Sequence, residues 1–138
     1  MESEQSIQDR AFAEGECFGC GPKNASGLQI KSFLQSDGSM LAHWSPGSEH
    51  SNGGAAVCGG ILSTILDCHC AAAASHALSS WAVTKEFSIE FLSPAPVETL
   101  ELVARVVEQR SRSVELEATA SVNGDVCVRF RGIFVVPR

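Results

Sequence analysis

Three features are missing from this sequence, and each absence excludes a class of protein. There is no excess of basic residues: 10 Lys and Arg stand against 16 Asp and Glu in 138 residues, a formal net charge of −6. A general nucleic-acid binder usually carries the opposite sign, so we expect no nucleic-acid partner. The first ten residues are polar and acidic, without the basic start and apolar run of a secretory signal. We therefore expect a cytoplasmic protein.

Long apolar runs are missing as well. The least charged stretch, from His50 to Thr84, still contains Asp67, His69 and His76, which makes it too polar for a membrane span. No internal repeat or low-complexity segment is present. Six cysteines in a cytoplasmic protein are expected to be reduced thiols rather than disulfides.

What the chain does contain is the pattern of one α+β domain. We expect the domain over residues 17–138, after a polar tail at residues 1–16. Helical spacing of apolar residues without proline predicts a helix over Val57–Ser79, about 30 Å long. Period-two alternation predicts about six antiparallel strands, beginning with 28–34 and 40–44 and ending with four consecutive strands after the helix. The sheet is expected to wrap the helix, and a β-barrel with the helix plugging one end is the alternative.

Asp67 is the residue that most needs an explanation. It is the only Asp, Glu, Lys or Arg between Glu49 and Lys85, and it falls in the middle of the predicted helix. A carboxylate in apolar surroundings is costly unless it is hydrogen-bonded, and such groups often have a perturbed pKa. Asp67 is therefore either a functional acid, or an acid that reaches solvent or bonds to Thr64 one turn earlier.

The start of the predicted helix offers a complement to this acid. Cys58, Gly59 and Gly60 open the helix, where the first N–H groups lack intrahelical partners and could stabilise an oxyanion. The glycines could also simply permit a tight turn. Gly59 and Asp67 lie about 12 Å apart along one helix, too far to reach one reacting carbon. If they share a site, two copies of the helix must pair antiparallel about a two-fold axis.

The segment from Asn52 to Asp67 resembles the signature of the hotdog-fold acyl-CoA thioesterases of the PaaI type. In that family an Asn precedes a His-Gly-Gly helix start by six residues, and an acid follows nine residues after the His. Asn52 and Asp67 keep both spacings, whereas Cys58 takes the place of the His. The strand that follows Thr84 and closes on a Pro-Ala pair is similar to the family's strand, and the lead-in at 17–28 is similar to that of one branch.

The resemblance implies a hotdog fold and hydrolysis of an acyl-CoA thioester to free acid and CoA, without metal or cofactor. Asp67 would be the general base or nucleophile, the Gly59 N–H would polarise the carbonyl, and Asn52 would position the water or the oxygen. The protein would be a homo-oligomer, either a dimer or a dimer of dimers, with no membrane partner.

Further residues are expected to bind the substrate. Arg110 and Arg112, at a predicted hairpin, could meet the nucleotide phosphates or could merely be solvated. Lys85 falls about where relatives place a Ser or Thr that holds water, and His50 could line the mouth of the site. The full expected set is Gly60, His50, Cys58, Thr84, Lys85, Arg110 and Arg112.

Other interpretations receive less support from the sequence. Cys17-x-x-Cys20 has no second closely spaced pair to complete a metal site, so no metal is expected. His69 points away from Asp67 on the helix and is expected to be a core or interface histidine. Two functional alternatives remain: a non-catalytic acyl-CoA binding or sensing module, favoured by the missing His at Cys58, and an acyl-thioester hydratase or dehydratase.

Overall fold

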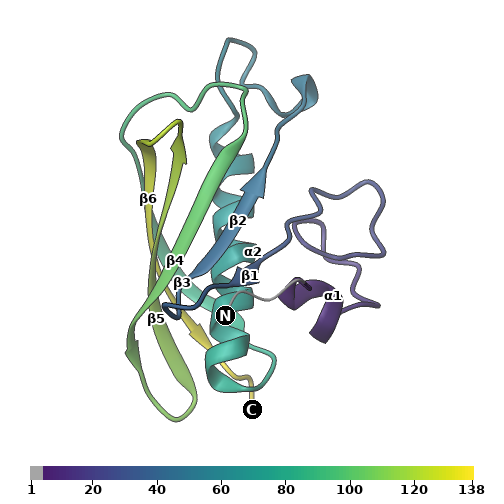
Figure 1. The fold of residues 1–138 in the computed structure, drawn as a ribbon, viewed down its shortest axis with the longest axis vertical. Coiled ribbons are helices and arrows are strands. Elements are labelled where there is room, and N and C mark those ends of the chain that lie inside the picture. The colour runs from purple at the N-terminus through teal and green to yellow at the C-terminus, as the bar shows by residue number, and fades with distance from the viewer. Residues whose placement is uncertain (1–4) are drawn as a thin grey trace.

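A single six-stranded sheet curves around one long helix (Figure 1). The structure is a computed structural model, and it describes residues 5–138. In chain order the elements are α1 (Ile7–Ala11), β1 (Phe33–Leu34), β2 (Met40–Trp44), the 3-10 turn η1 (Ser48–His50), α2 (Gly59–Leu78), β3 (Val83–Phe91), β4 (Leu100–Gln109), β5 (Ser113–Val122) and β6 (Asp125–Val135). This is the predicted α+β hotdog arrangement.

The strands follow the order β1-β2-β4-β5-β6-β3, and every neighbouring pair is antiparallel. The β5–β6 hairpin turns at Asn123 and Gly124, which both have positive φ, as the tight two-residue turns of hairpins require. The sheet keeps two edges, β1 and β3, and a closed barrel would have none. The barrel alternative is therefore wrong.

Helix α2 provides the centre of the core. Cys58 is its N-cap, and Ser79 ends it in the left-handed conformation with φ 50°, which confirms the helix predicted over residues 57–79. The alanines Ala72, Ala73 and Ala74 are buried, and their small side chains allow the sheet to approach closely. Residues 50–84 were expected to be too polar for a membrane span. By length and composition alone, however, α2 could cross a membrane. Half of its 20 residues are buried inside the fold, as is typical of a core helix.

His69 is the polar centre of this core. Its side chain is fully buried, and its Nε2–H donates to the carbonyl oxygen of Met40 at 3.0 Å. A carbonyl can only accept, so Nδ1 is the acceptor for the Ser32 hydroxyl at 2.7 Å. Gln8 completes the network through two hydrogen bonds to Ser32. The expectation of a core histidine is confirmed.

Burial lowers the pKa of His69 to about 4, against 6.5 for an exposed histidine. The unfolded chain therefore takes up a proton at a higher pH than the folded chain does. We expect the free energy of unfolding to fall by about 3 kcal/mol between pH 6.5 and pH 4, since each unit of pKa difference is worth about 1.4 kcal/mol. Urea unfolding at several pH values measures this slope.

The control for this prediction is His76, an exposed histidine on the same helix. The variant His76→Gln should keep the slope of the free energy of unfolding between pH 6.5 and pH 4. The variant His69→Asn should be less stable at pH 6.5 and should show a smaller slope over the same range. An unchanged slope in His69→Asn would assign the acid sensitivity to other groups.

The N-terminal segment packs onto the domain through α1. Ile7 and Gln8 are buried, and the Ile7 N–H donates to the Ser32 carbonyl at 2.8 Å. Residues 1–4 lie outside the described residues. Within the tail expected over residues 1–16, Ile7–Ala11 forms the helix α1 and packs against the core. An apolar residue at position 7 and a buried amide at position 8 anchor this short helix to the core.

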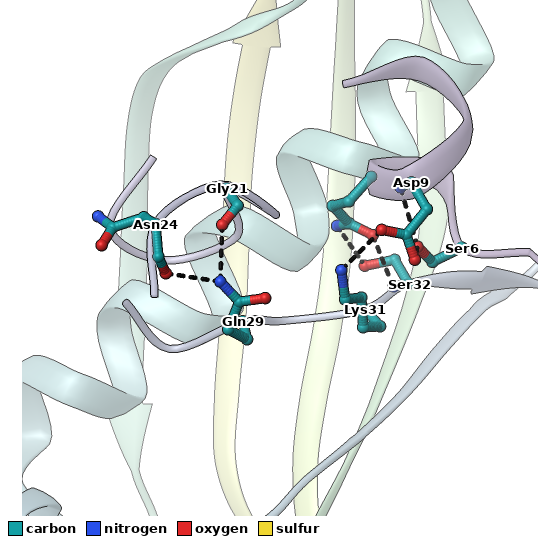
Figure 2. Close-up of polar contacts among 8 residues, drawn as sticks. Ser6, Asp9, Gly21, Asn24, Gln29, Lys31 and Ser32 are labelled. Carbon is teal, nitrogen blue, oxygen red and sulfur yellow. Dashed lines mark hydrogen bonds and ion pairs between the residues drawn. The ribbon is translucent and has the colours of Figure 1, made fainter. Parts of the chain in front are cut away.

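The strand predicted over residues 28–34 is also shorter than expected. Only Phe33 and Leu34 pair with β2. Gln29 has φ 58°, which breaks the extended backbone and turns the chain. Its side chain instead donates to the carbonyls of Gly21 at 2.8 Å and Asn24 at 2.6 Å (Figure 2). The loop before β1 is thus held by side-chain hydrogen bonds rather than by strand pairing.

Candidate active site

Asp67 lies half-buried on α2, where its carboxylate meets the start of β3. The Thr84 hydroxyl donates to Asp67 Oδ1 at 2.6 Å. Burial raises the pKa of Asp67 above its usual 3.8, and the hydrogen bond from Thr84 opposes this rise. Thr64, the partner considered from the sequence, bonds instead to the carbonyl of Gly60 one turn earlier at 2.9 Å. A carboxylate with a raised pKa and a fixed orientation is suited to general-base work.

A cavity of about 350 Å³ adjoins this carboxylate. Among the described residues, the only Asp, Glu, Lys, Arg or His side chains that line it are those of Asp67 and Glu16. Its walls are mostly apolar and include Phe12, Ala71, Ala72, Trp81, Ala82 and Val83. Trp81 is 61% exposed, so a large aromatic residue borders the cavity at the protein surface. The cavity is suited to an uncharged apolar group rather than to a phosphate.

Free backbone amides occur at the start of α2. The first hydrogen bond of the helix runs from the Leu62 N–H to the carbonyl of Cys58, the N-cap. The Cys58 N–H donates to the carbonyl of His50 at 2.8 Å. Within residues 5–138, no group accepts from the N–H of Gly59 or Gly60. No acidic side chain lies in this first turn. These donors are available to an oxygen that comes from outside the chain.

The surroundings of Gly59 include a residue that the sequence did not single out. A Cβ at Gly59 would lie 3.4 Å from the ring of Phe91 at the end of β3. Phe91 is 51% exposed. An aromatic ring therefore lies beside the free amides, and the antiparallel pairing of the end of β3 with the start of β6, where Phe91 lies opposite Val128, places it there.

One chain does not bring Asp67 and the glycine amides together. Both belong to the uninterrupted helix α2, on which eight residues correspond to a rise of about 12 Å. Asn52 lies in the loop before the helix, where its Oδ1 accepts from the Gly54 N–H at 2.8 Å. Its side chain is exposed and shapes that loop.

Three other expected substrate-binding residues have local surroundings of their own. The Nδ1 of His50 accepts from the Gly47 N–H at 2.9 Å, and its ring lies 5.0 Å from that of Trp44. Cys58 is the half-buried N-cap of α2. Lys85 is exposed at a β-bulge between its two neighbours in β3. The hydroxyl beside the Asp67 carboxylate therefore comes from Thr84, one residue before Lys85.

The two arginines lie at the far end of α2 from Gly59. Arg110 pairs with Glu108 at 3.0 Å, and Arg112 donates to the carbonyl of Val136 at 2.9 Å. Gln109 donates to the carbonyl of Ala77 at 3.0 Å, which ties this β4–β5 hairpin to the last turn of the helix. Within one chain the arginines are therefore remote from the free amides.

A cysteine cluster adjoins the cavity, and sequence spacing did not predict it. Cys17 and Cys20 lie beside Cys68, which directly follows Asp67. A hydrogen bond shared with Cys68 lowers the pKa of Cys20. Sequence spacing relates Cys17 only to Cys20, so a partner 51 residues further along the chain, Cys68, was not predicted.

The sheet order and the central helix define a hotdog-fold protein, and the comparisons identify its family. The family model of the thioesterase superfamily matches residues 54–128. The chain therefore belongs to the thioesterase superfamily. No curated protein matches it.

Solved structures with the same fold support this assignment. A thioesterase superfamily protein from Shewanella loihica is 30% identical, with a TM-score of 0.71 over 79% of this chain and 91% of that one. Escherichia coli PaaI, from the phenylacetic acid degradation operon, is 23% identical, with a TM-score of 0.70 over 80% of this chain and 81% of its own. A phenylacetic acid degradation-related protein from Ralstonia eutropha is 20% identical, with a TM-score of 0.76 over 95% and 99%. The last two show likeness of fold.

Proposed function

We propose that this protein hydrolyses acyl-CoA thioesters at a site shared between the two subunits of a homodimer. One observation carries the proposal: a half-buried carboxylate at Asp67, held by Thr84, lies on the same helix as the free amides of Gly59 and Gly60 but about 12 Å from them. Two helices packed antiparallel place the carboxylate of one subunit opposite the amides of the other.

The chemistry needs no group beyond this chain and water. The thioester carbonyl oxygen accepts from the partner helix's Gly59 N–H, which stabilises the negative charge that develops there. Asp67 takes a proton from water as the water oxygen attacks the carbonyl carbon. The C–S bond then breaks, and the thiolate of CoA takes up a proton to leave free acid and CoA. In the alternative route the Asp67 carboxylate attacks the carbonyl carbon, the C–S bond breaks to release the thiolate of CoA, which takes up a proton, and water hydrolyses the resulting mixed anhydride to free acid and the Asp67 carboxylate.

The free edge of the sheet supports the proposed dimer. β3 is a nine-residue edge strand with no second neighbour within the described residues. Phe87, Phe91 and Leu92 expose apolar side chains on or next to it, and Trp81 precedes it. Long apolar edge strands pair readily with another chain. We propose that β3 pairs with its symmetry copy and brings the two α2 helices together.

The distribution of charge supports an acyl-CoA substrate. The apolar cavity beside Asp67 suits the acyl group. In the proposed antiparallel pair, the β4–β5 hairpin of one subunit comes beside the helix start of the other. Arg110 and Arg112 would then be placed to meet the phosphates of CoA, which arginine binds through paired N–H groups. This role for the arginines depends on the dimer.

The experiment is a panel of acyl-CoAs of different chain length and polarity, with free thiol measured as the product. The proposal predicts thiol release catalysed by the pure protein. Binding of acyl-CoA without thiol release would support the non-catalytic binding module, which Cys58 in place of the family's His favours. Hydration of an enoyl-CoA without thiol release would support the hydratase alternative.

Thr84 provides a test of the proposed base through the pH profile. Its hydrogen bond lowers the pKa of Asp67, so Thr84→Val should raise that pKa further. The base is active when ionised, and kcat/KM therefore falls as the pH drops through this pKa. We expect the acid limb of the pH–kcat/KM profile to move to higher pH in Thr84→Val and to stay in place in Thr84→Ser. A profile that does not move would place the titrating group elsewhere.

A further inference from the structure

Three thiols from distant parts of the chain meet beside the cavity. Cys17 and Cys20 come from the loop before β1, and Cys68 comes from the middle of α2. Their three Sγ atoms all lie within 4.8 Å of one another, and the Cys17–Cys68 separation is 3.7 Å. All three are free thiols. A disulfide requires about 2.05 Å between sulfurs, so these atoms are arranged as a cluster without a bond.

The separations agree with those of a thiolate metal centre. Four sulfurs at about 2.3 Å from a tetrahedral Zn²⁺ lie about 3.8 Å from one another. The distance of 3.7 Å between the Cys17 and Cys68 sulfurs matches this separation. The other sulfur–sulfur distances in the cluster are longer than it by about 1 Å at most. The Cys-x-x-Cys spacing of Cys17 and Cys20 is also the spacing with which loops supply two ligands to zinc.

The loop approaches Cys68 closely because it carries glycine between the two cysteines. A Cβ at Gly19 would lie 2.2 Å from Cys68 Sγ, so any larger residue would push the loop away from the helix. Gly21 follows the second cysteine, and its N–H donates to the Cys17 carbonyl at 2.8 Å. A Cβ there would lie 2.3 Å from the Cys17 nitrogen. Two glycines therefore fold the loop so that both thiols face the helix.

Hydrogen bonds outside the cluster hold the loop in this shape. Gln29 donates to the carbonyls of Gly21 and Asn24 (Figure 2), and the Asn24 side chain donates to the Glu16 carbonyl at 3.2 Å. The Leu28 and Ile30 amides bond back to Phe18 and Gly19. Ligands held in place by such outer contacts lose little conformational freedom when a metal binds.

We propose that Cys17, Cys20 and Cys68 bind one Zn²⁺ ion as thiolates, with a water molecule from the cavity as the fourth ligand. Each thiol releases its proton on binding, because the thiolate is the metal ligand. Thiolate sulfur selects zinc over magnesium or calcium. The three cysteines line the same cavity as Asp67, which gives solvent access to the fourth position. The ion fastens the N-terminal loop to α2 one residue beyond the carboxylate.

The test is metal binding by the full chain, freed of metal and kept reduced. Zn²⁺ is titrated in competition with a chromophoric chelator, and Co²⁺ serves as a spectroscopic probe for thiolate coordination. We expect one Zn²⁺ per chain, bound more tightly than about 1 µM. Saturating Zn²⁺ should raise the thermal unfolding midpoint, because an ion that binds only the folded chain stabilises it. These measurements do not depend on thioesterase activity.

The matched variants are Cys17→Ala, Cys68→Ala and Cys58→Ala. Losing even an outer-shell partner of a zinc ligand weakens binding by about 10–100-fold, so losing a ligand should cost about 100-fold or more. Cys58 lies outside the cluster, and Cys58→Ala should bind Zn²⁺ as the parent chain does. Cys17 is exposed, so Cys17→Ala keeps the test open if Cys68→Ala fails to fold.

Three results would overturn the proposal. The first is a reduced chain that binds no Zn²⁺ in the competition assay. The second is binding that Cys17→Ala leaves unchanged. The third is a chain that loses two hydrogens in mass through a disulfide within the cluster and that binds no metal after reduction, which would make these thiols a redox pair.

Discussion

Replacing Asp67 by asparagine is expected to lower thioesterase activity by about 10²–10⁴-fold, the usual contribution of a general base. Asparagine has nearly the same shape and can still accept the hydrogen bond from Thr84. Folding should be unharmed, because burial already disfavours the charged form of Asp67, as its raised pKa records. The free energy of unfolding at neutral pH should therefore stay the same or rise. Thiol release and urea unfolding measure the two effects on one preparation.

The matched control is Asp125→Asn, at the exposed tip of the β5–β6 hairpin. It makes the same chemical change away from α2 and should keep both activity and stability. Activity of Asp67→Asn within about threefold of the parent would remove Asp67 from the role of base.

The second large effect is expected at Gly59, where proline removes the proposed oxyanion donor and little else. Gly59 is the first residue of α2, the position at which helices tolerate proline best. Cys58 has φ −56° and ψ 133°, an extended conformation that suits the residue before proline. Proline has no backbone N–H, and the Gly59 N–H that the substitution removes makes no hydrogen bond within residues 5–138. We expect activity to fall by about 10²–10³-fold, as for other lost oxyanion donors.

The variant Gly59→Ala separates the N–H from the space around it. Alanine keeps the donor, and its Cβ would meet the exposed ring of Phe91 at 3.4 Å, close to an ordinary contact. Gly59→Ala should retain most of the activity. Equal losses in the alanine and proline variants would show that crowding, rather than the amide, matters at this position.

The parts of the fold that could be predicted are those in which local pattern and tertiary structure agree. The spacing of apolar residues in a run without proline predicted α2 within two residues at its start and one at its end. Period-two alternation similarly indicated β4, β5 and β6. The strand predicted over residues 28–34 forms only at Phe33 and Leu34, and its start was wrong because a positive φ at Gln29 is not visible in a hydrophobic pattern.

The candidate site was predictable only in its helical part. Asp67 and Gly59 belong to one short segment, so spacing alone related them. The contact of Thr84 with Asp67, the ring of Phe91 and the meeting of Cys17 with Cys68 all join segments that only the tertiary fold brings together. Such contacts leave no trace in local periodicity. For the same reason Thr64 was an incorrect partner for Asp67: it was the nearest hydroxyl in sequence but bonds to its own helix backbone.

The most direct test of the shared site mixes two inactive variants. Chains carrying Asp67→Asn and chains carrying Gly59→Pro are unfolded together and refolded in equal amounts. Half of the dimers are then mixed, and each mixed dimer contains one intact site if the carboxylate and the amide come from different subunits. We predict recovery of about a quarter of the parent thiol-release activity. Activity no higher than that of the separate variants, in dimers shown to have mixed, would contradict a site built from two chains.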